Sequence, residues 1–205
     1  DIDAFNENEV FSDKLKYEQY IKVVHLLTAF RDGDLPMNKV FDLNTWSKWF
    51  ALGDIMGAWH EFSSLNMRFY YNPITSKIEP IPDDSYDETT TDPGDRIFRL
   101  EDQYNTTFDQ FLPNTFKDFE FLEKYMEELE RVSQSSYLDT IFEKLSAELN
   151  ENLDILHRDY PLYIFPKDQL YKNQEIIRKI LNPSRGVVAY FKNNQVDRLT
   201  LNIAN

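Results

Sequence analysis

The chain has 205 residues and a formal net charge of −14 at pH 7, and 41% of its residues are hydrophobic and 15% aromatic. This length and aromatic content suffice for one globular domain with a buried core, which excludes a disordered chain. The negative charge opposes binding to nucleic acid or to an anionic membrane surface, because like charges repel, and it favours a basic or neutral partner.

No apolar run approaches the length of a transmembrane helix, so no membrane span is predicted. The absence of cysteine excludes disulfides, thiolate nucleophiles and cysteine zinc sites. With only 5 glycines, the chain is expected to be dominated by helices.

The first predicted helix spans residues 14–32 and stops before Gly33. Its apolar face consists of Tyr17, Tyr20, Ile21, Val24 and Leu27. A second helix is predicted to begin at Asn44 or Thr45, either of which can cap it, and to end near Gly57. The stripe that this helix turns to the core is Trp46, Trp49, Phe50, Gly53 and Met56.

A hairpin is predicted next, because residues 67–71 and 77–81 both show strand-like alternation and an Asn-Pro pair breaks the run between them. A hairpin holds its two ends near each other, so Asn66 is expected across from Asp83 and Asp84. Amide and carboxylate oxygens are hard ligands, which suit a magnesium ion that bridges nucleotide phosphates. A solvated acidic loop or an adventitious calcium site is the alternative interpretation of the two aspartates.

The stretch from Asp83 to Asp95 is acidic and contains a Pro-Gly pair, which predicts a loop. Three more helices are predicted between prolines, over residues 115–132, 137–158 and 167–181. Near the end, Asn193-Asn194 predicts a turn and residues 196–205 predict a strand. The predicted fold class is therefore α+β, mostly α.

Several of these features follow one another in an order that resembles the spore-coat-protein-H (CotH) kinase family. The features are Phe41-Asp42-Leu43, the tryptophan-bearing helix, Gly57, Trp59, Asn66, the aromatic strand, Pro82, Asp84, the run Phe111-Leu112-Pro113-Asn114-Thr115 and Arg185. The resemblance covers roughly residues 14–192. It implies a kinase-like C-terminal lobe with a helical core and a β-hairpin, in a secreted or cell-surface bacterial protein.

The resemblance also implies roles for single residues. Asn66 and Asp84 correspond to residues that bind magnesium and ATP, and Asp87 is a further candidate metal ligand. His60 stands where the family places its catalytic Asp, and Glu61 is the rival base because its spacing to Asn66 is close to that of the family. The metal motif also lacks its Trp and its second Asp, so the site is degenerate.

His60 has a second interpretation. A neutral imidazole can accept a hydroxyl proton near pH 7, but a His in this place is also an ordinary polar residue at a helix end. The residues alone do not choose between His60 and Glu61 as the base.

Phosphoryl transfer needs a Lys on an N-terminal lobe that reaches the phosphates, and too few residues precede Lys14 to form such a lobe. Residues 1–192 are therefore interpreted as a C-terminal lobe, and residues 193–205 as a strand or linker that begins a following β domain.

Two hypotheses follow. The chain is either a fragment of a CotH-like kinase that uses magnesium and ATP to phosphorylate Ser or Thr of a surface or coat protein, or a pseudokinase-like interaction module. In both cases the expected partner is a protein, including other domains of the same chain.

Overall fold

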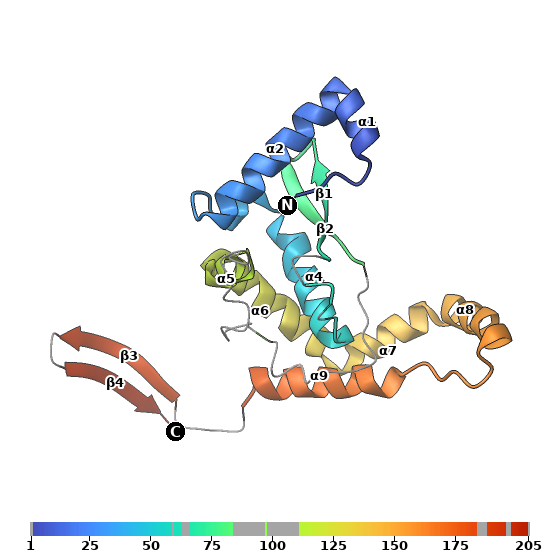
Figure 1. Cartoon of the computed structure of the whole chain (residues 1–205). Coiled ribbons are helices and arrows are strands. Elements are labelled where there is room, and N and C mark those ends of the chain that lie inside the picture. The colour runs from blue at the N-terminus through green and yellow to red at the C-terminus, as the bar shows by residue number, and fades with distance from the viewer. Residues whose placement is uncertain are drawn as a thin grey trace.

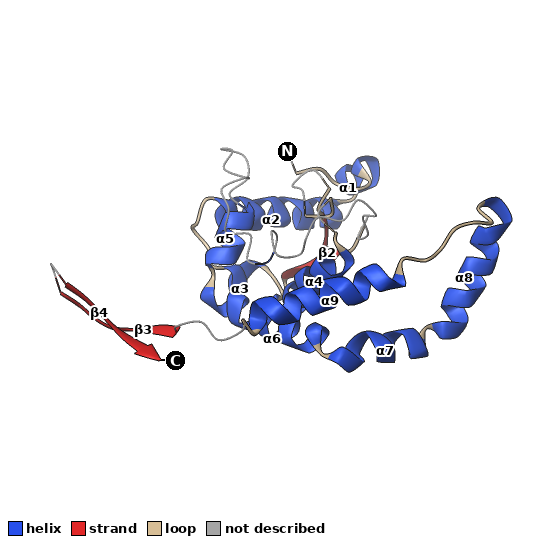
Figure 2. Cartoon of the chain, turned by 90° about the horizontal axis from the view of Figure 1, so that it is seen from below, coloured by secondary structure: helices blue, strands red, loops and turns tan. Residues whose placement is uncertain are grey.

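A computed structural model describes residues 2–58, 60–62, 66–83, 97, 111–183, 188–195 and 198–204, with side chains as far as residue 183. The described chain is mostly helical with two small antiparallel sheets, which confirms the α+β, mostly α, class (Figures 1 and 2). The helices are α1 (Glu7–Ser12), α2 (Lys14–Arg31), α3 (Met37–Val40), α4 (Leu43–Met56), α5 (Phe111–Lys117), α6 (Phe119–Ser133), α7 (Ser135–Lys144), α8 (Ser146–Asp159) and α9 (Lys167–Leu181). The strands are β1 (Arg68–Asn72), β2 (Lys77–Ile81), β3 (Val188–Gln195) and β4 (Arg198–Ala204).

Helix α4 lies at the centre of the molecule (Figure 1). Its N-cap lies two or three residues earlier than predicted, because the Asp42 carboxylate caps it by accepting a hydrogen bond from the Thr45 backbone N–H at 2.8 Å. Thr45 is thus the donor at this cap, and the prediction of Asn44 or Thr45 as the capping residue is wrong. The helix ends at Gly57 as predicted, where φ is 77°, a left-handed conformation that favours glycine.

The predicted hairpin is confirmed as the antiparallel pair β1 and β2, with Arg68 opposite Ile81. Its turn is closed by the Asn72 side-chain oxygen, which accepts hydrogen bonds from the Ile74 N–H at 3.0 Å and the Thr75 N–H at 3.3 Å. The hairpin is joined to α4 by the Trp46 indole, whose Nε1–H donates to the Ile78 carbonyl at 2.9 Å.

The core is aromatic and surrounds α4. Trp46, Trp49 and Phe50 are buried, as predicted. Helix α6 faces them with a stripe of fully buried side chains, Phe121, Tyr125, Leu129 and Val132. A polar contact joins the two helices, because the Tyr125 hydroxyl donates to the buried Asp54 carboxylate.

The predicted helix over residues 115–132 is in fact two helices that meet at Asp118. One Asp118 oxygen caps α6 by accepting from the Phe121 N–H at 3.0 Å, and the other accepts from the Met37 N–H at 3.1 Å. Asp118 therefore provides hydrogen-bond acceptors for a backbone N–H group in the first turn of α6 and for one at the start of α3. Neither α3 nor α1 was predicted.

The predicted helix over residues 137–158 is also wrong, because it is divided into α7 and α8 at Leu145. No glycine or proline marks the break. The helix over residues 167–181 is confirmed as α9.

The first predicted helix is confirmed as α2, and Leu27 is buried in the core, but Tyr17 at the other end of the predicted face is 44% exposed. Helix α5 is fixed to the end of α2 by Asn114. Its side-chain N–H₂ group donates to the Arg31 carbonyl at 2.8 Å and to the Phe30 carbonyl at 3.0 Å, and the Phe30 carbonyl also accepts from the Gly33 N–H at 3.1 Å.

The C-terminal strands β3 and β4 pair with each other in a separate sheet. The strand predicted for residues 196–205 is confirmed as β4, but the predicted turn is wrong, because Asn193 and Asn194 lie within β3 opposite Thr200 and Leu199. The predicted boundary at residue 193 thus falls inside β3. No helix in the described ranges is long and apolar enough to cross a membrane.

Candidate functional site

The candidate site is formed by the chain that leaves α4, residues 57–62, and by the two ends of the β1–β2 hairpin. After Gly57, the Ala58 N–H donates to the Gly53 carbonyl at 2.9 Å, which turns the chain back against α4. Phe62 then packs on Phe50, with ring centroids 4.7 Å apart and planes 16° from parallel. The segment between these contacts carries the two predicted bases.

The two predicted bases lie in different surroundings. His60 is exposed, whereas Glu61 is only 1% exposed. The Glu61 Oε1 atom accepts a hydrogen bond from the Trp49 indole N–H and a second one from the Asp83 backbone N–H at 3.2 Å. Glu61 thereby links α4 to the residue that follows the hairpin.

Asn66 contacts the same segment, residues 60–62, through a hydrogen bond to its backbone. Its side-chain N–H₂ group donates to the His60 carbonyl at 3.1 Å. Continuing the register that pairs Arg68 with Ile81 places Asn66 opposite Asp83, which agrees with the predicted approach of the hairpin ends. The Asp83 carboxylate lies 4.0 Å from Arg68 Nε in an exposed ion pair, which contributes little to stability.

The remaining predicted ligands, Asp84 and Asp87, lie outside the described residues, and so do Trp59, Arg185 and the acidic stretch from residue 84 to residue 95. Asn66 is therefore the one predicted magnesium ligand that has a described position. Within the described ranges, no group of three or more His, Asp or Glu side chains is placed to hold a metal ion.

The link from Trp49 to Glu61 was not predicted. A signal for it exists in the sequence, because a buried indole N–H needs an acceptor, but the sequence does not say which of the many acidic residues supplies it.

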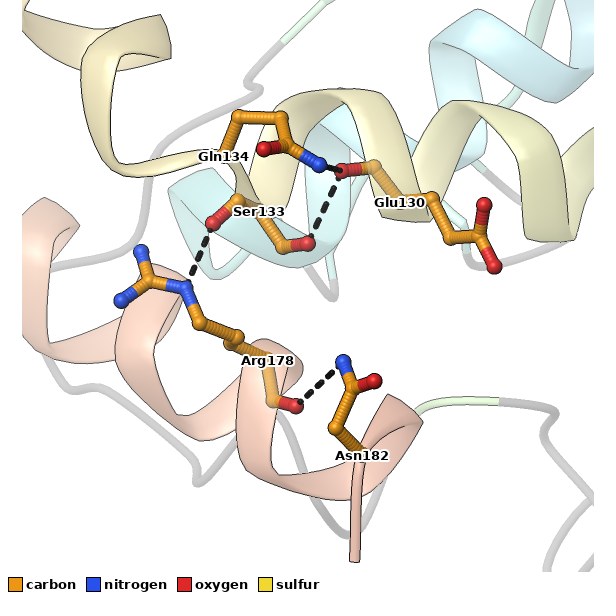
Figure 3. A pocket seen from close by; sticks show the side chains of 5 residues that line it. All are labelled: Glu130, Ser133, Gln134, Arg178 and Asn182. Atoms are coloured by element: carbon orange, nitrogen blue, oxygen red, sulfur yellow. Dashed lines mark hydrogen bonds between the residues drawn. The ribbon is translucent and has the colours of Figure 1, made fainter.

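A separate pocket of about 380 Å³ lies at the C-terminal ends of α6 and α9 (Figure 3). Its lining residues are Glu130, Ser133, Gln134, Arg178 and Asn182. Arg178 Nε donates to the Ser133 carbonyl at 2.9 Å, and the Asn182 side chain donates to the Arg178 carbonyl at 3.2 Å. These donors satisfy carbonyls at helix ends, so the contacts in this pocket are those of a helix junction.

Replacing Glu61 with alanine is expected to lower the free energy of unfolding by about 2 kcal/mol, because two N–H donors lose their acceptor. Glu61→Gln keeps an acceptor oxygen and should cost less. The exposed His60 offers the matched control, and His60→Ala should change stability by less than about 0.5 kcal/mol. Denaturant unfolding followed by circular dichroism measures all three, and an equal cost for Glu61→Ala and His60→Ala would contradict the structural role of Glu61.

A scan of protein-family models, a search of curated proteins and a search of solved structures each found no match to this chain.

Proposed function

We propose that this chain is a kinase-like domain that acts as a protein-binding module and transfers no phosphate. The observation that carries the proposal is the position of Glu61. A general base must reach the hydroxyl proton of its substrate. The Glu61 carboxylate is instead buried, and it accepts hydrogen bonds from Trp49 and from Asp83.

The residue before Glu61 also supports a binding role, because His60 replaces the acid that the CotH family uses at this place. The resemblance to that family further supports a secreted or cell-surface bacterial assembly as the setting, with a protein or another domain of the same chain as the partner.

A second candidate function is an active CotH-like kinase that phosphorylates Ser or Thr of a surface or coat protein. The hairpin register favours it, because extending the register beyond the pair Arg68 and Ile81 would bring Asn66 opposite Asp83, next to the start of the acidic stretch. Asn66, Asp84 and Asp87 would then hold magnesium and ATP, and the exposed His60 would orient the hydroxyl.

Phosphate transfer separates the two candidates. We expect the chain to bind Mg-ATP with a Kd above about 1 mM, less than about 4 kcal/mol of binding free energy, because the candidate ligands Asn66, Asp84 and Asp87 would hold the magnesium ion but would not attract the nucleotide phosphates themselves. Calorimetric titration measures the affinity, and radiolabelled ATP with a Ser-rich protein measures transfer.

The control variants are His60→Ala and Asp84→Ala. Labelling by the unaltered chain that either substitution abolishes, in a protein whose circular dichroism is unchanged, would overturn the binding-module proposal and establish the kinase. No labelling in any of the three proteins is the expected result.

A further inference from the structure

The helices α7 and α8 and the segment that returns to α9 form an arm that leaves the body of the molecule (Figure 2). The base of this arm is anchored. The Tyr171 hydroxyl of α9 donates to the Asp139 carboxylate of α7 at 2.6 Å, and this hydrogen bond raises the pKa of Tyr171 to about 12. Phe142 of α7 packs against Phe165, with ring centroids 6.1 Å apart. The arm therefore leaves the body in a fixed direction.

The outer part of the arm lacks such support. We define the outer arm as Leu145, α8 and residues 160–164. Helix α8 has no buried residue, and in the described part of the chain it packs mainly against α7. It nevertheless has an apolar stripe at helical spacing, formed by Leu145, Leu149, Leu153, Leu156 and Tyr160. The members at its two ends are well exposed, Leu145 at 47% and Tyr160 at 64%, whereas the three leucines between them are partly buried.

The returning segment adds apolar surface next to this helix. Leu162 is 91% exposed and Ile164 is 85% exposed. His157 near the end of α8 makes a hydrogen bond to the Tyr163 carbonyl at 2.9 Å, which holds the segment beside the helix. Exposed apolar side chains of α8 and of the returning segment therefore lie next to one another.

Helix α8 gains little stability from packing within this chain, because none of its residues is buried. A single helix of about this length is marginal in water, and most helices in proteins are stabilised by packing of their apolar face. Exposed apolar surface of this kind marks a binding site.

The outer arm carries an excess of negative charge, which favours a basic partner. Helix α8 carries four acidic residues, Glu148, Glu151, Asp154 and Asp159, against a single arginine, Arg158. Glu148 and Asp159 flank one side of the apolar stripe, as their helical spacing places them. A second copy of this chain, with its own net charge of −14, would bring like charges together.

We propose that the outer arm is a docking surface for a basic amphipathic helix of another protein. The apolar face of that helix lies against the leucine stripe and Leu162, and its Lys or Arg side chains lie beside Glu148 and Asp159. Recognition of this kind uses apolar anchors at i, i+4 and i+7 on the bound helix. The proposal deepens the proposed function by naming the surface and the class of partner, and it rests on that function only in assuming that the domain acts by binding.

The test uses fluorescently labelled model peptides and the full chain. The probe is an amphipathic Leu–Lys peptide, compared with a Leu–Glu peptide of the same pattern and with a Leu–Lys peptide of scrambled pattern. Fluorescence anisotropy should show that the patterned basic peptide binds at least about tenfold more tightly than the other two. Equal binding of the basic patterned and scrambled peptides would overturn the proposal, because charge alone would then explain it.

Two matched pairs of variants place the binding on the arm. Leu162→Ser with Ile164→Ser should weaken binding at least about tenfold, whereas Ile74→Ser with Phe119→Ser, two exposed apolar residues elsewhere, should leave it unchanged. Glu148→Lys with Asp159→Lys should weaken it more than the same charge change at the exposed Glu123 and Glu127 of α6.

Two further outcomes would overturn this proposal, and a third concerns only the proposed function. Equal loss in the arm variants and in their controls would overturn it, and so would sedimentation that shows a dimer dissolved by the Leu162→Ser and Ile164→Ser pair. Peptide binding together with phosphate transfer would overturn the proposed function alone, because the two readouts are measured separately on one protein.

Discussion

Trp46→Ala is expected to lower the free energy of unfolding by about 4 kcal/mol. The Trp46 side chain is completely buried. Its ring lies against Phe41 at 4.5 Å and against Phe69 of the hairpin at 5.6 Å between centroids, so its removal leaves a cavity between α4 and β1. The Ile78 carbonyl also loses the indole donor. Denaturant unfolding followed by circular dichroism measures the cost.

Trp46→Phe separates the two contributions. A phenyl ring fills much of the space but donates no hydrogen bond, so this variant should cost about 1 to 2 kcal/mol. A loss below about 1 kcal/mol for Trp46→Ala would show that Trp46 does not hold the hairpin against α4.

Gly53→Ala is expected to destabilise the protein by about 3 kcal/mol, although alanine is the better helix former by about 1 kcal/mol. A Cβ atom at Gly53 would lie 2.2 Å from Phe62 Cζ and 2.6 Å from Phe62 Cε2. Phe62 cannot move easily, because it is buried and stacked on Phe50. A thermal melt by circular dichroism should therefore show a lower Tm.

A second substitution tests the cause. Phe62→Ala removes the ring that the new methyl group would strike, so Gly53→Ala should become nearly neutral or stabilising when it is added to Phe62→Ala. Additive costs in the double variant would show that the two side chains do not compete for one space.

The sequence was most informative where pattern and burial agree. The apolar residues of α4 recur every third or fourth position, as in a helix, and those of the hairpin recur every second position, as in strands. Both predictions are confirmed. The break at Leu145 has no such signal, because neither glycine nor proline is present and the helical spacing of apolar residues continues across it.

The candidate site shows a different limit. The hairpin register predicts the approach of Asn66 and Asp83, since pairing along the strands fixes it. The buried carboxylate of Glu61 instead accepts a hydrogen bond from Trp49, a residue of α4. The identity of an acidic residue in a sequence does not show whether its carboxylate is solvated or buried. The burial of Glu61 could therefore not have been predicted from the residues alone.

The attachment of α5 to the end of α2 bears on how this chain tolerates change. Asn114 holds one end of the connection between the hairpin and α5, and the β1–β2 pairing holds the other end. When both ends of a connection are fixed, doubling its length costs only about 0.6 kcal/mol of closure entropy. Ile97, the residue of this connection that the structure describes, is 6% exposed and belongs to the core. Changes in length between Asp83 and Phe111 that keep Ile97 should therefore cost little stability, whereas a change that removes Ile97 should destabilise the core.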